Sequence, residues 1–497
     1  MKEIAASITK NASAMLGAQA VTWVSGFVLM IFLPRYLGSE AFGRLYVALS
    51  FSMIAQVLVD YGAYLFIAKE IARSPENAPS VIGNSVGLRI VLAVVACAAM
   101  IIGGFIAGYQ TEIITMILIF GLAKFWEGIL AVIRSSFQGF ERMEFNSIAN
   151  VIERIVLLLF VVLVLMLGGN TVFIAIAMAS STLIGTLVAA RYLTRFVTRI
   201  PPFDWPHILA LARRGIPYFL VAVFATIYYR INAIMLSLLV TEEIVGWFGA
   251  AFRFFDVLMF LPSIFSFAVF PVLSRMSNEK DTARATTRKS FELLFMAVVP
   301  ISMAVFIYSD QIVDLLFGRA EYGGSAAVLQ ALSVGLILVY LNFVLVTTLI
   351  AMDKHRQWSL VALGAIPLSI GLNWLLIPLF ETMSANGGVG SAIATNLTEL
   401  FVMLCAFILL PKGYIGIESL KRLGKCTVAG CTMMGASVAL APYLPYWWLG
   451  ASLAVGSYCV MLYVVRFFDT AELRFATSMM TVSGLRAMFS SEGRNAR

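Results

Sequence analysis

The chain has 497 residues, of which 61% are hydrophobic and 12% are charged, and its formal net charge is +8. A water-soluble protein of this size cannot bury so much apolar surface, and runs of about 20 apolar residues, enough to cross a bilayer, recur from end to end. The short alternating segments of a transmembrane barrel are absent. The composition therefore predicts an all-α integral membrane protein. Its positive charge is typical of inner loops rich in Lys and Arg, so no nucleic-acid partner is expected.

Fourteen apolar spans can be drawn along the chain. They cover residues 13–33, 44–66, 81–106, 113–135, 147–167, 171–194, 216–239, 244–271, 290–310, 325–351, 358–380, 388–410, 427–443 and 446–467. The first sixteen residues lack the apolar core and small-residue cleavage site of a signal peptide, so the first span is expected to be a retained helix.

The positive charges are divided unequally between the two sets of loops. If the amino terminus is inside, 27 of the 35 Lys and Arg residues fall in inner segments and three, Arg35, Arg44 and Arg319, fall in outer ones. This asymmetry predicts an even number of spans with both termini cytoplasmic. The inner segment 201–215 contains prolines and an apolar face that could form a short helix lying on the membrane.

An internal repeat relates the first pair of spans to the seventh and eighth. LGSEAFGRLYVALSF, from Leu37, aligns with VTEEIVGWFGAAFRF, from Val240, at an offset of 203 residues. Glu40 then matches Glu243, and Gly43 matches Gly246. Each copy has six spans and begins on the inner side of the membrane, so the two copies have the same orientation and the repeat is parallel. Two such bundles around a central cavity are typical of transporters.

The repeat predicts how the chain is divided. A first lobe covers residues 1–200 with six spans, and an inter-lobe cytoplasmic linker covers 201–215. A second lobe of six spans covers 216–411, and two accessory helices occupy 412–467. A basic cytoplasmic tail, 468–497, follows and is expected to be exposed.

Four basic residues inside apolar spans are candidates for binding an anionic substrate. A charge at bilayer depth normally faces protein or water, and Arg suits the oxygens of a phosphate group especially well. The candidates are Lys124, Arg154, Arg230 and Arg253.

Arg230 lies near the middle of its span, too deep to snorkel, but the other three residues also have a simpler interpretation. Lys124 could be neutralised by Glu127, three residues further along the same helix. Arg154 lies near enough to the inner surface to snorkel outwards. Arg253 could pair with Asp256, three residues away. A fifth basic residue, Arg89, lies closer to the inner surface and is predicted to be an anchor.

Three carboxylates in the spans, Asp60, Asp256 and Glu399, are candidates for coupling transport to a proton or sodium gradient, although each could equally be a hydrogen-bonded structural residue.

His207 and His355 lie in predicted inner loops, and the five cysteines lack metal-ligand spacing. No nucleotide-binding motif is present. No catalytic residue, metal site or cofactor is therefore predicted, and an ion gradient, the membrane potential or removal of product must supply the energy.

Six stretches in order resemble the bacterial polysaccharide flippases, which belong to the superfamily of multidrug, oligosaccharidyl-lipid and polysaccharide exporters. The stretches are FLPRYLGSEAFGRLYVALSF (32–51), VDYGAYLFIAKEIAR (59–73), FQGFERMEFNSIANVIERI (137–155), GIPYFLVAVFATIYYRINAIML (215–236), VGWFGAAFRFFDVLMFLP (245–262) and IPLFETMSANGGVGSAIATNLTEL (377–400). The stretches are spread over residues 32–400, and the resemblance extends over nearly the whole chain.

The resemblance implies fourteen helices, arranged as two six-helix lobes plus two accessory helices, in a bacterial plasma membrane. It also implies that an undecaprenyl-pyrophosphate-linked oligosaccharide crosses from the inner to the outer leaflet by alternating access, for exopolysaccharide or O-antigen synthesis. A polysaccharide polymerase and a chain-length regulator are expected partners. The alternative within the superfamily is a cation-coupled multidrug exporter. A membrane enzyme is disfavoured because every predicted outer loop is short.

Overall fold

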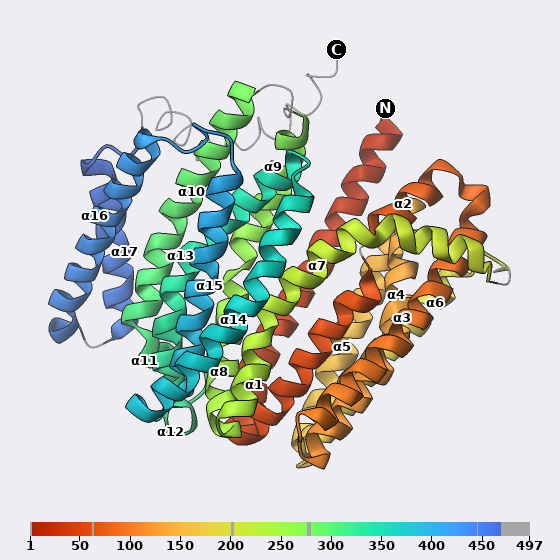
Figure 1. Cartoon of the computed structure of the whole chain (residues 1–497), viewed down its shortest axis with the longest axis horizontal. Coiled ribbons are helices and arrows are strands. Elements are labelled where there is room, and N and C mark those ends of the chain that lie inside the picture. The colour runs from red at the N-terminus through yellow and green to blue at the C-terminus, as the bar shows by residue number, and fades with distance from the viewer. Residues whose placement is uncertain (1, 62–63, 200–202, 276–279, 445, 469–497) are drawn as a thin grey trace.

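The computed structural model describes the whole chain except residues 1, 62–63, 200–202, 276–279, 445 and 469–497. Almost all of the predicted tail, 468–497, therefore lies outside the described residues. The described part is helical throughout, and Figure 1 shows the helices running side by side between an upper end, where α1 begins, and a lower end near α12.

The main helices follow the apolar spans of the sequence, with short helices between some of them. Their bounds are α1 Lys2–Asp60, α2 Tyr64–Arg73, α3 Ala78–Ile106, α4 Thr111–Gly139, α5 Met143–Met166, α6 Thr171–Leu193, α7 Trp205–Leu239, α8 Glu242–Leu258, α9 Phe260–Arg275, α10 Lys280–Ile307, α11 Ser309–Leu316, α12 Arg319–Tyr322, α13 Gly324–Ala351, α14 His355–Ser384, α15 Gly387–Leu409, α16 Ile417–Leu440 and α17 Trp447–Val464.

The 59 residues of α1 make two crossings, because the chain folds back at Gly38. Gly38 has a φ of 76° and a ψ of 169°, a conformation that only glycine adopts readily. Thirteen helical segments of the described chain are long and apolar enough to span a membrane, and α1 is counted once among them. Thirteen segments with one folded in two give fourteen crossings, which confirms the predicted all-α membrane fold.

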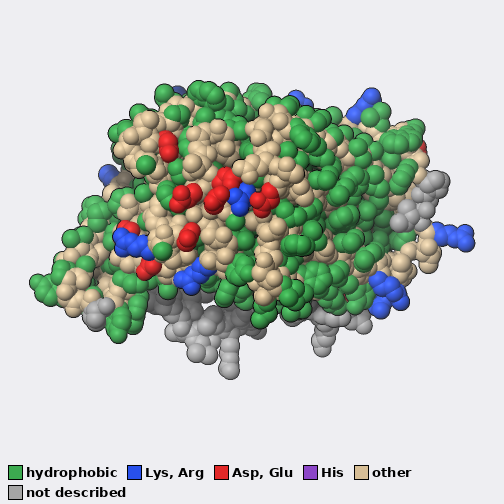
Figure 2. Space-filling view, turned by 90° about the horizontal axis from the view of Figure 1, so that it is seen from below, with side chains coloured by type: hydrophobic (Ala, Val, Ile, Leu, Met, Phe, Trp, Pro, Cys, Tyr) green, Lys and Arg blue, Asp and Glu red, His purple; other side chains and the backbone are tan. Residues whose placement is uncertain are grey.

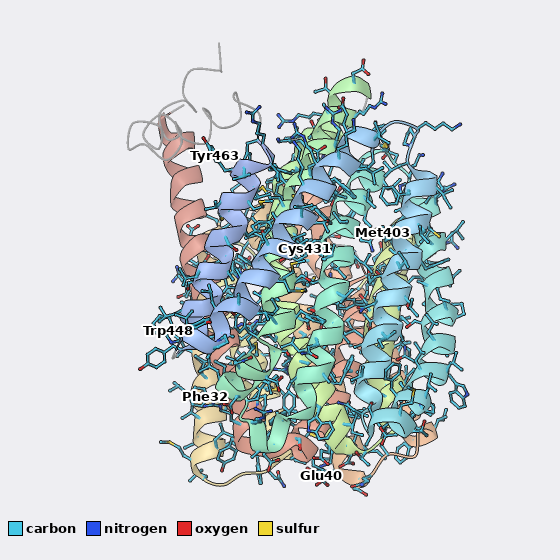
Figure 3. The ribbon with its side chains drawn as sticks, turned by 90° about the vertical axis from the view of Figure 1, so that its left-hand side faces the viewer. Phe32, Glu40, Met403, Cys431, Trp448 and Tyr463 are labelled. Atoms are coloured by element: carbon cyan, nitrogen blue, oxygen red, sulfur yellow. The ribbon has the colours of Figure 1, made fainter. Side chains whose placement is uncertain are left out.

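The helices form two groups. Helices α1 to α6 form one side of the molecule, and α8 to α15 form the other; α16 packs on α10 and, with α17, forms the far edge. Figure 3 looks at that edge and shows α17 rising from Trp448 towards Tyr463, with Glu40 at the lower end. The accessory helices therefore lie away from the boundary between the two groups.

Helix α7 joins the two groups and differs from its prediction. The segment 201–215 was expected to be a linker with a separate surface helix, but from Trp205 onwards it is continuous with the seventh span. Figure 1 shows the first part of α7, in yellow, at the upper end of the first group, where it contacts α3. Asn84 holds it there by accepting a hydrogen bond of 2.8 Å from the backbone N–H of Asp204. The linker is thus a packed helix of the first group.

The two copies of the sequence repeat meet at the lower end. A Cβ atom on Gly43 would collide with the backbone oxygen of Glu242, and a Cβ atom on Gly246 would collide with the backbone oxygen of Ser39. Ser39 and Glu242 are themselves 203 residues apart, so the repeat makes the same contact twice, once in each direction. Only glycine allows two backbones to approach so closely.

Charged groups cross the same boundary. Arg44, on the second arm of α1, lies 2.7 Å from Glu242 of α8 and 3.0 Å from both Glu40 and Glu112. Figure 2, seen from below, shows acidic side chains gathered around a basic one on this face. The lower end is therefore closed by backbone packing at the glycines and by ion pairs at their rim.

We expect Gly43→Ala and Gly246→Ala to open the lower end, because the added methyl groups have no space against a backbone oxygen. Overpacking of this kind costs about 1–3 kcal/mol. Spin labels at the exposed positions Gln110 and Arg319, one on each group, should move further apart, as measured by double electron–electron resonance. Gly26→Ala is the matched control, since its Cβ would meet nothing within 4 Å. An unchanged distance in both glycine variants would contradict this account of the closure.

Candidate functional site

A cavity of about 570 Å³ lies in the first group of helices, within the upper halves of its spans. It is lined by α1, α2, α3, α4, α5 and α6. Its charged residues are four cations and three carboxylates: Arg89, Lys124, Arg134, Arg154, Asp60, Glu127 and Glu153. The sequence predicted a central cavity between the two bundles, whereas this cavity is lined by the first group of helices alone.

Two of the ion pairs in this cavity share one glutamine. Lys124 pairs with Glu127, as the spacing suggested, and also donates a hydrogen bond of 2.9 Å to Gln56. Gln56 in turn donates to Asp60 over 3.0 Å, and Arg89 reaches Asp60 over 3.3 Å. The predicted anchor role of Arg89 is wrong, because its side chain is 2% exposed and points inward to this pair. These contacts join α1, α3 and α4 into one network.

The third ion pair uses the last of the three carboxylates, so one of the four cations in the cavity has no partner among them. Arg134 of α4 lies 2.6 Å from Glu153 of α5. The neighbouring Arg154 makes no ion pair with any described residue, and its buried Nε atom has no hydrogen-bond partner. Since six of the seven charges are paired, Arg154 gives the cavity its excess positive charge.

A second cavity of about 800 Å³ lies in the other group, lined by α7, α8, α9, α13, α14 and α15. Its walls are mainly apolar, and its three charged residues are Arg230, Asp256 and Glu399. Met53 of α1 borders this cavity and the first one, so the two spaces adjoin at the boundary between the groups.

Asp256 pairs with Arg230 and not with Arg253, which corrects the pairing suggested by the sequence. Arg230 Nη1 lies 3.0 Å from Asp256 Oδ2, and the Tyr229 hydroxyl donates to Asp256 Oδ1 over 3.0 Å. The contact between helices α7 and α8 overrides the three-residue spacing along α8. The Arg230 guanidinium also lies over the ring of Phe252, 5.5 Å from its centroid.

The other two predicted residues of this lobe have contrasting positions. Arg253 lines neither cavity, and its guanidinium lies over the Phe42 ring, 5.6 Å from the centroid, between α8 and α1. Glu399 is 3% exposed, lines the second cavity and has no cationic partner among the described residues. It accepts a hydrogen bond of 2.7 Å from Asn342, and the Tyr228 hydroxyl also lies within hydrogen-bonding reach.

Below the second cavity, a neutral polar network was missed at the sequence level. Asn232 of α7 accepts from Ser369 and Asn373 of α14 and donates to Thr395 of α15, at 2.7 to 3.0 Å. Ser391 completes it by donating to Asn373. The signal was present as polar residues four apart, at 369 and 373 and at 391 and 395. The network ties three helices together without charge.

The comparisons with known proteins agree with this geometry. Residues 8–277, more than half of the chain, match the family of polysaccharide biosynthesis proteins. The chain is 20% identical over 424 residues to the "Probable low-salt glycan biosynthesis flippase Agl15" of Haloferax volcanii, covering 82% of this chain and 84% of that one. It is 23% identical over 414 residues to the "Putative O-antigen transporter" of Shigella dysenteriae, covering 80% and 98%.

Solved structures share the fold. A lipid II flippase, MurJ, in an inward closed conformation superposes with a TM-score of 0.72 at 13% identity, covering 92% of this chain and 99% of that one. An inward-facing multidrug resistance transporter of the MATE family gives a TM-score of 0.62 at 17% identity, covering 82% and 94%.

The helices therefore define a multi-pass α-helical membrane protein whose fold is shared by the lipid II flippase and the MATE transporter. The chain belongs to the polysaccharide biosynthesis protein family, and the resemblance seen in the sequence is confirmed.

The pair formed by Asp60 and Arg89 predicts an asymmetry between two variants. Asp60→Asn leaves a buried guanidinium without its counter-charge, whereas Arg89→Met leaves a carboxylate whose side chain is 46% exposed to water. We expect Asp60→Asn to cost about 1–3 kcal/mol, below the figure of ~3–5 kcal/mol for a fully buried pair. Arg89→Met should cost less, and the double variant should resemble Arg89→Met alone. Apparent melting temperatures in detergent, followed by tryptophan fluorescence, test this order; the reverse order would contradict it.

Proposed function

We propose that the protein is a flippase that moves an undecaprenyl-pyrophosphate-linked oligosaccharide from the inner to the outer leaflet by alternating access. The observation that carries the proposal is Arg154, the unpaired cation in the first cavity. A pyrophosphate would supply the oxygens that the guanidinium lacks. The names of the two curated relatives, a glycan biosynthesis flippase and an O-antigen transporter, support the same substrate class.

The closed lower end supports alternating access. Both cavities lie above the glycine contact, so a substrate head would enter from the upper end and leave only after that contact separates. We propose that the upper end is cytoplasmic, because the loops there carry most of the Lys and Arg residues. The membrane would be the bacterial plasma membrane, and a polymerase and a chain-length regulator would receive the exported unit. The chain would act as a transporter and not as an enzyme.

Coupling to a proton or sodium gradient is proposed for the paired carboxylates Asp60 and Asp256. Neutralising either one would release its arginine partner, Arg89 or Arg230, towards phosphate oxygens. Glu399, the third carboxylate predicted for this role, has no arginine to release. Arg253 is left to a positioning role beside Phe42, because it lines neither cavity.

The second candidate function is cation-coupled multidrug export, and the mainly apolar second cavity with its two carboxylates favours it. Deletion of the gene in the native host separates the two functions. Accumulation of lipid-linked sugar in the inner leaflet would establish flipping. An unchanged distribution of glycolipid with altered drug sensitivity would establish multidrug export instead.

We expect Arg154→Gln to slow flipping at least tenfold, because one charge-assisted hydrogen bond is worth about 1.5–3 kcal/mol and about 1.4 kcal/mol is a factor of ten. The assay is the rate at which lipid-linked sugar reaches the outer leaflet of proteoliposomes. Arg142→Gln is the control: this residue lies at the start of the same helix, but it is exposed and paired with Glu144. A normal rate for Arg154→Gln at normal protein level would refute the assignment.

Coupling is tested by imposing a proton or a sodium gradient on the same proteoliposomes. Asp60→Asn and Asp256→Asn should each remove the gradient-dependent part of the rate, since the neutral side chains cannot exchange an ion. The exposed carboxylate variant Glu418→Gln should keep the full response. If both aspartate variants respond as the unaltered protein does, these residues do not couple transport.

A further inference from the structure

We propose that the second cavity is a sugar subsite that accepts neutral sugars and rejects acidic ones, with Glu399 as the discriminating residue. This inference rests on the proposed function and goes further, because it assigns the chemical class of the glycan. The charged side chains that line the two adjoining cavities support it, because their net charges have opposite signs. The first has four cations and three carboxylates, and the second has one cation and two carboxylates.

Two polar side chains of the second cavity could meet a ligand as acceptors. The Glu399 carboxyl group accepts a hydrogen bond of 2.7 Å from Asn342 Nδ2 and has no cationic partner among the described residues. The other atom of the Asn342 amide, Oδ1, is buried and has no partner. Asn342 is itself 4% exposed and lines the cavity. An orphaned acceptor in this position calls for a donor from a ligand.

Sugar hydroxyls are such donors. Ser266 Oγ, which also lines the cavity and has no partner, offers a further hydroxyl contact. Aromatic side chains complete the lining, with Tyr228, Tyr229 and Trp358 all bordering the space. Aromatic rings provide apolar faces for the C–H faces of a sugar ring. Acceptors together with aromatic rings are the groups that a neutral sugar requires.

The Glu399 carboxylate would repel an acidic sugar. The sugar carboxylate would come close to the Glu399 carboxylate, and two like charges repel each other. Arg230 cannot relieve this repulsion, since its guanidinium already pairs with Asp256 at 3.0 Å. The adjoining first cavity would take the pyrophosphate at Arg154, and Met53 marks the boundary between the two subsites.

The test uses two synthetic polyprenyl-pyrophosphate disaccharides that differ only in their second sugar, glucose or glucuronic acid. The protein is reconstituted in liposomes at pH 7.5, and sugar reaching the outer leaflet is measured. We expect the glucose form to move at least ten times faster. Glu399→Gln keeps the shape but removes the charge, and it should bring the two rates close together. Glu418→Gln, an exposed carboxylate outside both cavities, should leave the ratio unchanged.

The remaining outcomes of the test decide for or against the inference. Equal rates for both substrates in the unaltered protein would overturn it, and so would an unchanged ratio in Glu399→Gln. Should that variant fail to fold, Asn342→Asp adds a negative charge to the same wall and should widen the ratio. A uniform slowing of both substrates by Glu399→Gln would mark the residue as a proton site only. If neither substrate moves while the protein is folded, the proposed flippase function itself fails.

Discussion

The cost of holding a charge inside the hydrocarbon layer governs this structure. Each charged side chain in the spans must find a counter-charge, a hydrogen bond, an aromatic face or water. Around the first cavity, pairing consumes all the charges except Arg154. Around the second cavity it consumes all except Glu399. The two exceptions have opposite signs, and they are the groups with something left to offer a ligand.

The same constraint explains the placement of the ion pairs between helices. Asp60 and Arg89 join α1 to α3, and Arg134 and Glu153 join α4 to α5. Such pairs fix the relative position of their helices, because separating them would strand a charge in an apolar environment. The result is a group of helices held together around a polar interior.

Closure at the lower end depends on a different force, the close packing of two backbones. Gly43 and Gly246 let the second arm of α1 approach α8, and their positions in the repeat make the contact nearly symmetrical. Apolar helices in lipid gain little from hydrophobic association, so small residues that permit close van der Waals contact are the usual means of holding them together.

The sequence by itself determined the class of protein and the positions of the spans, because the bilayer imposes a length and a composition on each crossing. It also identified the repeat and most of the charged residues that line the cavities. It suggested one partner correctly, Glu127 for Lys124, but not the partners on other helices. Arg89 was expected to be an anchor and is buried in an ion pair, and Asp256, which could have paired with Arg253 along its own helix, pairs with Arg230 of α7. Only the tertiary structure decided which charges were neutralised and which, Arg154 and Glu399, remained, because pairing between helices depends on rotations and crossings that spacing along one helix does not contain.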